Sequence, residues 1–531
     1  MRVPGFKNAR AEEHRSDQYR MKTAPPLSWL RRGALALAAS FCVAPALSAT
    51  WSIVIVDTAT GQVCVASATC IVGADLQNLL PVMRVGVGGA AAQSAIDQTG
   101  GNRFRIWQGF IDGKTPQDIL DELAANDTSH DQRQYGIVNM DDMPVKFTGN
   151  KAGNARASVQ GTNGTEKHAV QGNVLTAKKV VFQSRKTLVR SHGDLAQRVM
   201  MAMETARDLG GDGRCSCPTG MPEDCGAPPA QFDSSAAISF IVMSRIGDTD
   251  GLCDAINGCA NGDYYLSLNV TPGKPKVDAV SELRKAFDIW RADLAGHPDH
   301  LLSIAEPEAT ALPADGQTRT TVHVMLRDVD GIPITNGTSL VEVTTESGSP
   351  ITALGPVLSD GNGGYSFDVI AGTTTGLERF IVTADDGTQK ATLYPYLEVR
   401  LDAPTGLHSG FDAISAQSES AIVPFTIDLG TAAAGDPYLL LGSFSGTTPG
   451  QQLGNLFIPL NFDSFFEFSA RNPGPPTLPG SAGALDSAGR AQAFYDTTPV
   501  MLGELAGLRL DWAVLTASGQ VAGPVGFDIL P

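Results

Sequence analysis

The run Thr50-Trp-Ser-Ile-Val-Ile-Val-Asp57 is followed by the turn Thr58-Ala-Thr-Gly-Gln62 and by the run Val63-Cys-Val-Ala-Ser-Ala-Thr-Cys70. Both runs are rich in apolar and β-branched residues, and the segment between them contains glycine and threonine. Two such runs joined by a short turn are typical of a β-hairpin. The sequence therefore predicts that a folded domain begins with a hairpin close to residue 50.

The pattern of strands and helices continues from this hairpin to about residue 300. Strands are expected at 83–93, 135–139, 145–148, 236–243 and 264–270, with a strand end at 168–173. Helices are expected at 102–110, 115–125, 192–209 and 277–294. Apolar residues recur in the 192–209 segment with the 3.6-residue period of a helix. Strands and helices in this order favour two antiparallel sheets covered by helices on both sides, an α+β domain.

The remainder of the chain has the composition of β structure. Residues 301–400 are strand-like throughout, and residues 401–531 are strand-like with long turns rich in Gly, Pro and Ser. Proline and glycine clusters at 311–317 and 403–406 mark the junctions. We therefore expect a multidomain protein with a leader at 1–49, an α+β domain at 50–300, a β-sandwich at 301–400 and a second all-β sandwich at 401–531.

Residues 1–20 form a polar, mixed-charge N-terminal extension, and the segment from Met21 to Ala49 has the pattern of an export signal. Lys22, Arg31 and Arg32 precede an apolar run of about eleven residues at 33–43, and small residues follow Pro45. The run is too short to span a bilayer, which needs about 20 residues, so no transmembrane segment is expected in the mature chain. Cleavage after Ala49 would make Thr50 the new N-terminus, whereas cleavage after Ser48 would leave Ala49 in front of it.

Charge and cysteine content agree with a place outside the cell. The net charge of −17 becomes −22 when residues 1–49, with eight basic and three acidic residues, are removed. Such an acidic surface repels phosphate backbones and anionic lipids, which makes nucleic acids and membrane surfaces poor partners. We expect a secreted, extracellular or cell-surface protein, with the periplasm left open.

Seven cysteines follow residue 49, and in an oxidising compartment we expect disulfides. Cys64 and Cys70 lie about 20 Å apart on one predicted strand, too far to pair with each other. The odd number leaves one thiol unpaired. Cys215, Cys217 and Cys225 allow a metal site as an alternative, but no histidine lies near them, and we expect no metal and no cofactor.

The domain at 50–300 contains an ordered set of short stretches: Thr50-Trp-Ser-Ile-Val54, Gln93-Ser94, Arg133-Gln134, Phe147-Thr-Gly149, Ala169-Val-Gln-Gly-Asn173, Gly211-Asp-Gly-Arg214 and Ser234-Ser-Ala-Ala237. Through these stretches the domain resembles the domain-of-unknown-function family 1028. The resemblance implies an N-terminal-nucleophile (Ntn) hydrolase fold, an αββα sandwich with the first mature residue at the mouth of a cleft. The family has no established activity. The cysteine-bearing segment 215–229 departs from the family's pattern and is expected to reshape or cover the cleft.

The two β-rich regions carry weaker resemblances. Residues 301–400 resemble a bacterial immunoglobulin-like (invasin/intimin-type) repeat through Asp328-Val-Asp-Gly331, Ile334-Thr-Asn-Gly-Thr338 and Ser359-Asp-Gly-Asn-Gly-Gly364. Such modules serve as spacers or adhesive stalks. Residues 401–531 resemble a C-terminal β-module of large exported bacterial proteins, to which no function attaches.

A threonine at a free N-terminus carries its own base, because the α-amine has a pKa of about 8 and can accept the hydroxyl proton. We therefore predict Thr50 as the nucleophile of an amide hydrolase that acts on a peptide or cell-wall substrate. Asp57 is a candidate to orient the amine. Gln93, Ser94 and Asn173 are candidates to stabilise an oxyanion. The alternative for each of them is a structural role in turns and packed sheets.

The competing hypothesis for the whole chain is a non-catalytic surface, adhesion or cell-wall-binding protein that reuses the same fold. Among the other motifs, Asp248-Thr-Asp-Gly251 lacks the rest of a calcium loop. His168 and His192 are interpreted as structural. The N-terminal residue of the mature chain separates the two hypotheses, because Ala49 in that position removes the free amine from Thr50.

Overall fold

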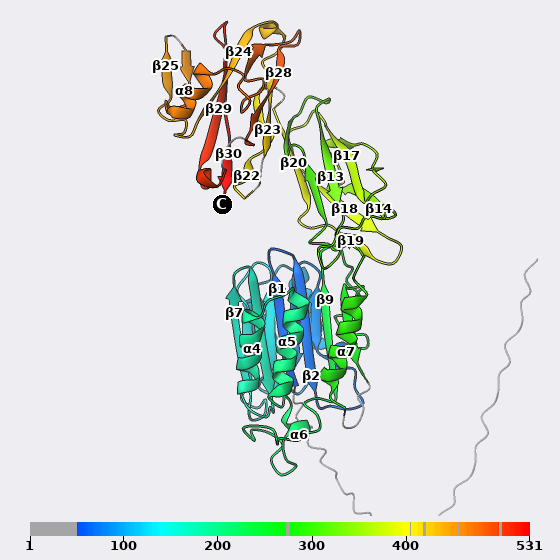
Figure 1. Ribbon diagram of the computed structural model, residues 1–531. Helices are drawn as coiled ribbons and strands as arrows, with labels where there is room; N and C mark the ends of the chain where they lie inside the picture. Colours follow the sequence, from blue (N-terminus) through cyan, green and yellow to red (C-terminus); the bar gives the residue numbers. More distant parts are fainter. Residues whose placement is uncertain (1–49, 272–276, 404, 418–420, 455, 499–501) are drawn as a thin grey trace, which may run out of the picture. The chain divides into compact units, whose positions relative to one another are not determined.

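A computed structural model describes residues 50–271, 277–403, 405–417, 421–454, 456–498 and 502–531. The predicted N-terminal extension and signal peptide at 1–49 lie outside the described residues. An α/β region comes first along the chain, and an all-β region follows it, as expected (Figure 1). Within the described part of the chain, no helix is long and apolar enough to cross a membrane.

A six-stranded antiparallel sheet in the order β10-β9-β2-β1-β8-β7 forms the centre of the first region. Its strands are β1 (Thr50–Asp57), β2 (Gln62–Thr69), β7 (Ala157–Asn163), β8 (Glu166–Asn173), β9 (Ile238–Ser244) and β10 (Leu266–Val270). The predicted hairpin is confirmed as β1 and β2, which pair from Trp51–Ala68 to Asp57–Gln62. Nearly all residues of both strands are buried, because the sheet is covered on both faces.

A second sheet packs on one face of the first. It has the order β3-β4-β5-β6, with β3 (Pro81–Arg84), β4 (Gly88–Gln93), β5 (Gln134–Asn139) and β6 (Val145–Thr148). Val54 and Val65 of the first sheet share one apolar cluster with Ala91 and Val138 of the second. The sheets approach so closely that a Cβ at Gly89 would lie 2.9 Å from a Val63 methyl group, so glycine is required there.

Helices cover the outer faces of both sheets. Helices α4 (Lys179–Arg190), α5 (Leu195–Asp208) and α7 (Ala279–Ala292) pack on the six-stranded sheet (Figure 1). Helices α2 (Gly101–Ile111) and α3 (Pro116–Asn126) pack on the four-stranded sheet. The layers are therefore helix, sheet, sheet and helix. The predicted start of α3 is confirmed, because the Thr115 hydroxyl accepts a hydrogen bond from the amide of Asp118.

Three disulfides lie in this region: Cys70–Cys215, Cys217–Cys225 and Cys253–Cys259. Cys64 is the unpaired thiol and is buried in β2, where burial raises its pKa far above the usual range. Cys64 and Cys70 do not pair with each other, as their spacing predicted. The alternative of a metal site at Cys215, Cys217 and Cys225 is wrong, because all three sulfurs are in disulfides.

The segment from 304 to 402 forms two sheets around one core. One sheet has the order β11-β13-β17-β15, with β16 also on β17, and the other has the order β12-β20-β18-β14, with β19 on β18. The strands are β11 (Ile304–Pro307), β12 (Ala311–Pro313), β13 (Arg319–Met325), β14 (Leu340–Thr345), β15 (Thr352–Leu354), β16 (Leu358–Ser359), β17 (Gly364–Ala371), β18 (Gly376–Asp385), β19 (Lys390–Thr392) and β20 (Leu397–Asp402). Buried residues alternate along β17 and β18, which is typical of a β-sandwich.

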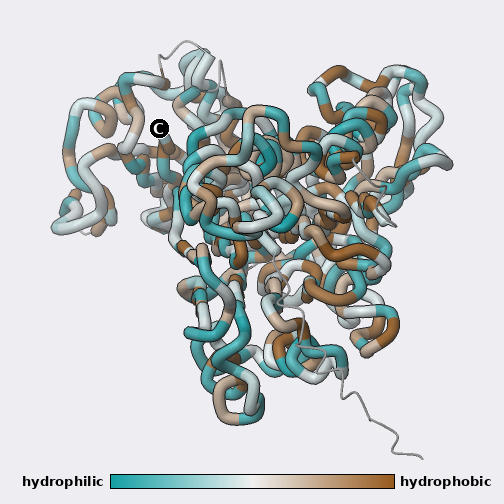
Figure 2. Tube along the Cα trace, turned by 90° about the horizontal axis from the view of Figure 1, so that it is seen from below, coloured by the Kyte–Doolittle hydropathy of each residue, from teal (hydrophilic) through white to brown (hydrophobic). Residues whose placement is uncertain are grey.

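The last segment is also β-rich and has its own core around Phe425, Tyr495, Trp512 and Phe527. Its strands are β21 (Gly406–Ser409), β22 (Ala413–Ser415), β23 (Ile422–Asp428), β24 (Pro437–Ser443), β25 (Gln451–Leu453), β26 (Leu456–Ile458), β27 (Ala482–Ala484), β28 (Arg490–Asp496), β29 (Arg509–Thr516) and β30 (Val521–Leu530). A helix not expected from the sequence, α8 (Ser464–Arg471), lies between β26 and β27. Buried and less buried residues alternate along β23, as one-sided burial of a strand requires. Figure 2 shows hydrophilic and hydrophobic residues intermingled along the chain.

Candidate functional site

Thr50, the predicted nucleophile, is the first residue of β1 and is fully buried. It lies opposite Asn173 of β8 in the sheet register. Its hydroxyl donates to the hydroxyl of Thr69 at the end of β2, with 3.4 Å between the oxygens. Its carbonyl oxygen accepts a hydrogen bond of 3.0 Å from Nε2 of Gln93. The start of β1 is therefore held by side chains from two other strands.

Gln93 joins the ends of the two sheets. It is the last residue of β4, and its Oε1 accepts a bond of 2.6 Å from the Ser52 hydroxyl of β1. Its Nε2 also donates to Oε1 of Gln134 on β5 at 2.9 Å. Gln134 in turn donates to the carbonyl of Gly172, next to Asn173. These buried amides bring Thr50 and Gln93 together.

Ser94 and Asn173 also meet at this end of the sheets. Asn173 Nδ2 donates to the Ser94 hydroxyl at 3.2 Å and to the carbonyl of Ala152 at 3.0 Å. Ser94 has a φ of 60° and Ala95 a φ of 33°. A left-handed backbone at a residue other than glycine costs about 1 kcal/mol or more, and such strain gathers at functional sites. The four residues Thr50, Gln93, Ser94 and Asn173 therefore form one cluster.

Asp57 does not belong to this cluster. It ends β1, seven residues after Thr50, which is about 23 Å along a strand. Its carboxylate accepts hydrogen bonds from Ala59 N, Thr60 Oγ1 and Thr165 Oγ1. The expectation that Asp57 orients the Thr50 amine is therefore corrected, because the extended strand carries the two residues to opposite ends of the sheet. Asp57 stabilises the turn instead.

Two charged residues beside the cluster were not predicted as site residues. Asp212 is fully buried, and its Oδ2 accepts a bond of 2.6 Å from the amide of Cys70 and one of 2.8 Å from Arg214 Nη2. Arg214 Nη2 also donates to the Thr69 hydroxyl at 3.3 Å. Both residues lie in the Gly211-Asp-Gly-Arg214 stretch that carries part of the family resemblance. That stretch was the available signal, but nothing local to it indicates that it folds against β2.

Gln93 also lines a narrow hollow together with Asn102, Arg103, Arg133 and Tyr135. Arg133 of this hollow forms an ion pair with Asp127. Asp127 accepts 2.7 Å bonds from Asn102 Nδ2 and Arg133 Nε. Burial alone would raise the pKa of Asp127, but hydrogen bonds from Arg133, Asn102 and the amide of Ser129 outweigh it and lower that pKa to about 2. Asp127 therefore remains ionised and holds Arg133 in place.

The other sequence motifs do not form a site. Asp248 accepts bonds from the amides of Arg245 and Tyr265, and Asp250 pairs with Arg84. Their carboxylates are thus used in holding loops. Among the described residues, no group of three or more His, Cys, Asp or Glu side chains is arranged to hold a metal ion. His168 is buried and accepts a bond from Arg185 Nε.

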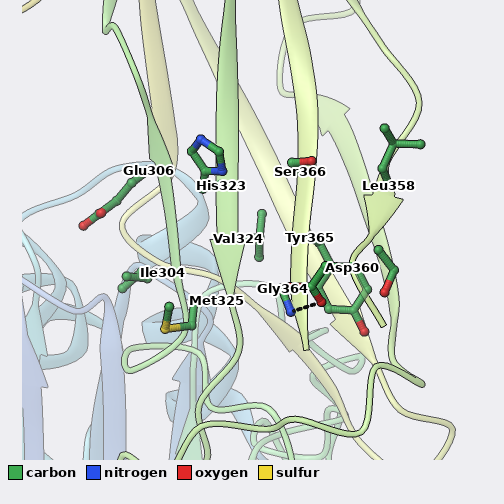
Figure 3. Close-up of a pocket in the computed structure, with 11 residues that line it drawn as sticks. Ile304, Glu306, His323, Val324, Met325, Leu358, Asp360, Gly364, Tyr365 and Ser366 are labelled. Carbon is green, nitrogen blue, oxygen red and sulfur yellow. Dashed lines mark hydrogen bonds between the residues drawn. The ribbon is translucent and has the colours of Figure 1, made fainter. Parts of the chain in front are cut away.

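The outer face of the β11-β13-β17 sheet carries a shallow hollow (Figure 3). Met325 pairs with Gly364 and Leu358 with Ser366, so the two small residues of β17 form a floor between larger side chains. Met325 and Leu358 are 44% and 62% exposed. The Asp360 carboxylate accepts the amide of Gly364 at 3.0 Å and belongs to the turn. Glu306 and His323, which lie opposite each other in the sheet register, also line the hollow.

Comparison with known families matches two parts of the chain. Residues 50–220 match the model of a family of unknown function, DUF1028, and residues 301–394 match the model of invasin, domain 3. These matches confirm two of the three predicted resemblances, those to the family of unknown function and to the invasin-type repeat. No curated protein matches the chain significantly.

Similar solved structures come from both groups. A DUF1028-family protein from Silicibacter pomeroyi is 17% identical, with a TM-score of 0.34, over 46% of this chain and 89% of that one. InvD of Yersinia pseudotuberculosis is 18% identical, with a TM-score of 0.17, over 43% of this chain and 56% of that one. The Escherichia coli adhesin FdeC is 11% identical, with a TM-score of 0.17, over 91% and 97%. Similarity at this level supports no further conclusion.

Proposed function

From the matches of residues 50–220 to DUF1028 and of residues 301–394 to invasin domain 3, we propose that this protein is exported and acts as a surface or adhesin-like protein. The invasin domain 3 match is the observation that carries the proposal. It is supported by three disulfides, which form and persist in oxidising compartments. In this proposal, modules at 50–300, 301–400 and 401–531 follow a cleaved leader, and the β-modules present the first domain outside the cell.

The test is attachment of beads coated with the full mature chain to two surfaces, cells of the producing bacterium and cultured epithelial cells. If the protein is adhesin-like, the coated beads remain attached to at least one of the two surfaces. An excess of the soluble chain then prevents this attachment. Beads coated with albumin at equal density are the control. Retention no greater than that of albumin beads on both surfaces would refute the adhesive role.

A second candidate function is an Ntn-type amide hydrolase with Thr50 as nucleophile and a peptide or cell-wall substrate. The observation that favours it is the cluster of Gln93, Ser94 and Asn173 around the first residue of a central strand. The layer order of helix, sheet, sheet and helix also agrees with an Ntn fold. In the full-length chain the Thr50 nitrogen belongs to the peptide bond with Ala49. This candidate therefore requires cleavage directly after Ala49, since only then is the amine free to act as base.

A further inference from the structure

Asp212 and Arg214 form a planar, two-point ion pair at the end of β2. Arg214 Nε lies 3.1 Å from Asp212 Oδ1, and Arg214 Nη2 lies 2.8 Å from Asp212 Oδ2. The Asp212 side chain is fully buried, whereas that of Arg214 is 25% exposed. A two-point contact fixes the plane of the guanidinium as well as its position. Arg214 is therefore a rigid donor and not a mobile surface side chain.

This pair contacts the candidate nucleophile through one intervening hydroxyl. Arg214 Nη2 donates to Thr69 Oγ1 at 3.3 Å, and the Thr50 hydroxyl donates to the same oxygen at 3.4 Å. Thr69 ends β2, directly beside the start of β1. The position of the Thr69 hydroxyl sets one of the directions available to the Thr50 hydroxyl. The geometry thus links Arg214 to Thr50 without direct contact.

Covalent bonds hold the same elements together on both sides of the pair. Cys70 follows Thr69, Cys215 follows Arg214, and these two cysteines form a disulfide across 145 residues. The amide of Cys70 also donates to Asp212 Oδ2 at 2.6 Å. The disulfide therefore fastens the backbone that carries Arg214 to the backbone that carries Thr69. Because neither segment can move away without the other, the hydrogen bond between Arg214 and Thr69 is kept.

We propose that Asp212 and Arg214 are positioning residues for Thr50, and that the Cys70–Cys215 disulfide keeps them in place. Asp212 orients the guanidinium, Arg214 holds the Thr69 hydroxyl, and Thr69 directs the hydroxyl of Thr50. This role gives a function to the start of the cysteine-bearing segment that departs from the family pattern. The proposal rests on the second candidate function, because it concerns the reactivity of Thr50.

The experiment measures acylation of the purified mature chain by a fluorescent β-lactone, a probe that reacts with activated hydroxyl groups. The Thr50 oxygen forms an ester with the lactone carbonyl while the ring C–O bond breaks, and the hydroxyl proton passes to the released alkoxide. N-terminal sequencing first establishes that the chain begins at Thr50. The Thr50→Ala variant identifies the labelled residue. If the wild-type chain labels no faster than Thr50→Ala, the hydrolase candidate itself fails.

Arg214→Gln and Arg214→Lys test the positioning role. We expect Arg214→Gln to slow labelling about tenfold or more, since it removes a hydrogen bond from a charged donor. Arg214→Lys keeps the charge without the planar fork and should restore only part of the rate. Arg207→Gln is the matched control, because Arg207 is also 25% exposed and ion-paired, and its rate should equal that of the wild type.

The outcomes remain decisive if one variant does not fold. If Arg214→Gln unfolds below the assay temperature, Arg214→Lys alone decides, because a folded Lys variant that labels at the wild-type rate would overturn the proposal. If both variants fold and label like the wild type, the positioning role is also wrong while the Thr50 nucleophile stands. A slowed Arg214→Gln with partial rescue by lysine supports it.

Discussion

Removal of the Cys70–Cys215 disulfide should lower the free energy of unfolding of the α/β region by about 5 kcal/mol. The cross-link closes a loop of 145 residues, and a loop of that length restricts the unfolded chain strongly. The double variant Cys70→Ser/Cys215→Ser opens the loop and leaves no unpaired thiol. Hydrogen exchange of the amides of β1, followed by mass spectrometry, reports the opening of this region without interference from the β-sandwiches.

The matched control is Cys217→Ser/Cys225→Ser, which opens a loop of only 8 residues. The same relation gives about 2.5 kcal/mol for this loop. The long-range disulfide should therefore have about twice the effect of the short one. If the β1 amides of the two double variants exchange at the same rate, the Cys70–Cys215 disulfide does not restrain the central sheet. The proposal that this disulfide keeps Arg214 beside Thr69 is then contradicted.

The second large effect concerns pH. Burial and the neighbouring Arg185 lower the pKa of His168 from 6.5 to about 4, although Glu166 acts in the opposite direction. The Arg185 Nε–H donates to His168 Nε2, so the folded protein holds the ring neutral with its proton on Nδ1. Because the unfolded chain takes up the proton at a higher pH, the folded state gains stability from neutral His168 above pH 6.5. That stability is lost as the pH falls from 6.5 to about 4, and it amounts to about 3 kcal/mol.

The variant His168→Gln should flatten this part of the curve of unfolding free energy against pH. Glutamine retains an acceptor for Arg185 but does not titrate. Urea unfolding at intervals between pH 7 and pH 4 gives both curves, and their difference isolates His168 from other groups. If the curves run parallel over this range, His168 takes up its proton over the same pH range in the folded and the unfolded protein, and the assignment of a buried neutral histidine is wrong.

The sequence predicts the first hairpin and most helices because their signals are local. The runs that become β1 and β2 are apolar and separated by a turn, and α3 begins at a threonine cap followed by proline. Helix α4 was not predicted, although it has 12 residues. Its buried residues Val180, Val181, Ser184 and Leu188 lie at helical spacing, but its cap residue makes no side-chain hydrogen bond and gives no local signal for the start of the helix. Packing on the sheet, which the local sequence does not reveal, stabilises this helix.

The candidate site was only partly predictable for a similar reason. Gln93, Ser94 and Asn173 were expected near Thr50, and the sheet register brings them there. The prediction that Asp57 orients the Thr50 amine was wrong, because an extended strand carries residues that are close in sequence far apart in space. Arg214 was missed because it meets Thr69 from 145 positions away, through a turn that a disulfide holds. Contacts of this kind depend on the tertiary fold and leave no periodic pattern.

The intact mass of the protein recovered from outside producing cells tests the central claim most directly, because it reports cleavage and oxidation together. We predict the mass of residues 50–531 less the two hydrogens that each of three disulfides removes, with Cys64 as the one thiol that alkylates after unfolding. A chain found only inside the cells, with residues 1–49 attached and its cysteines alkylated, would contradict an exported surface protein.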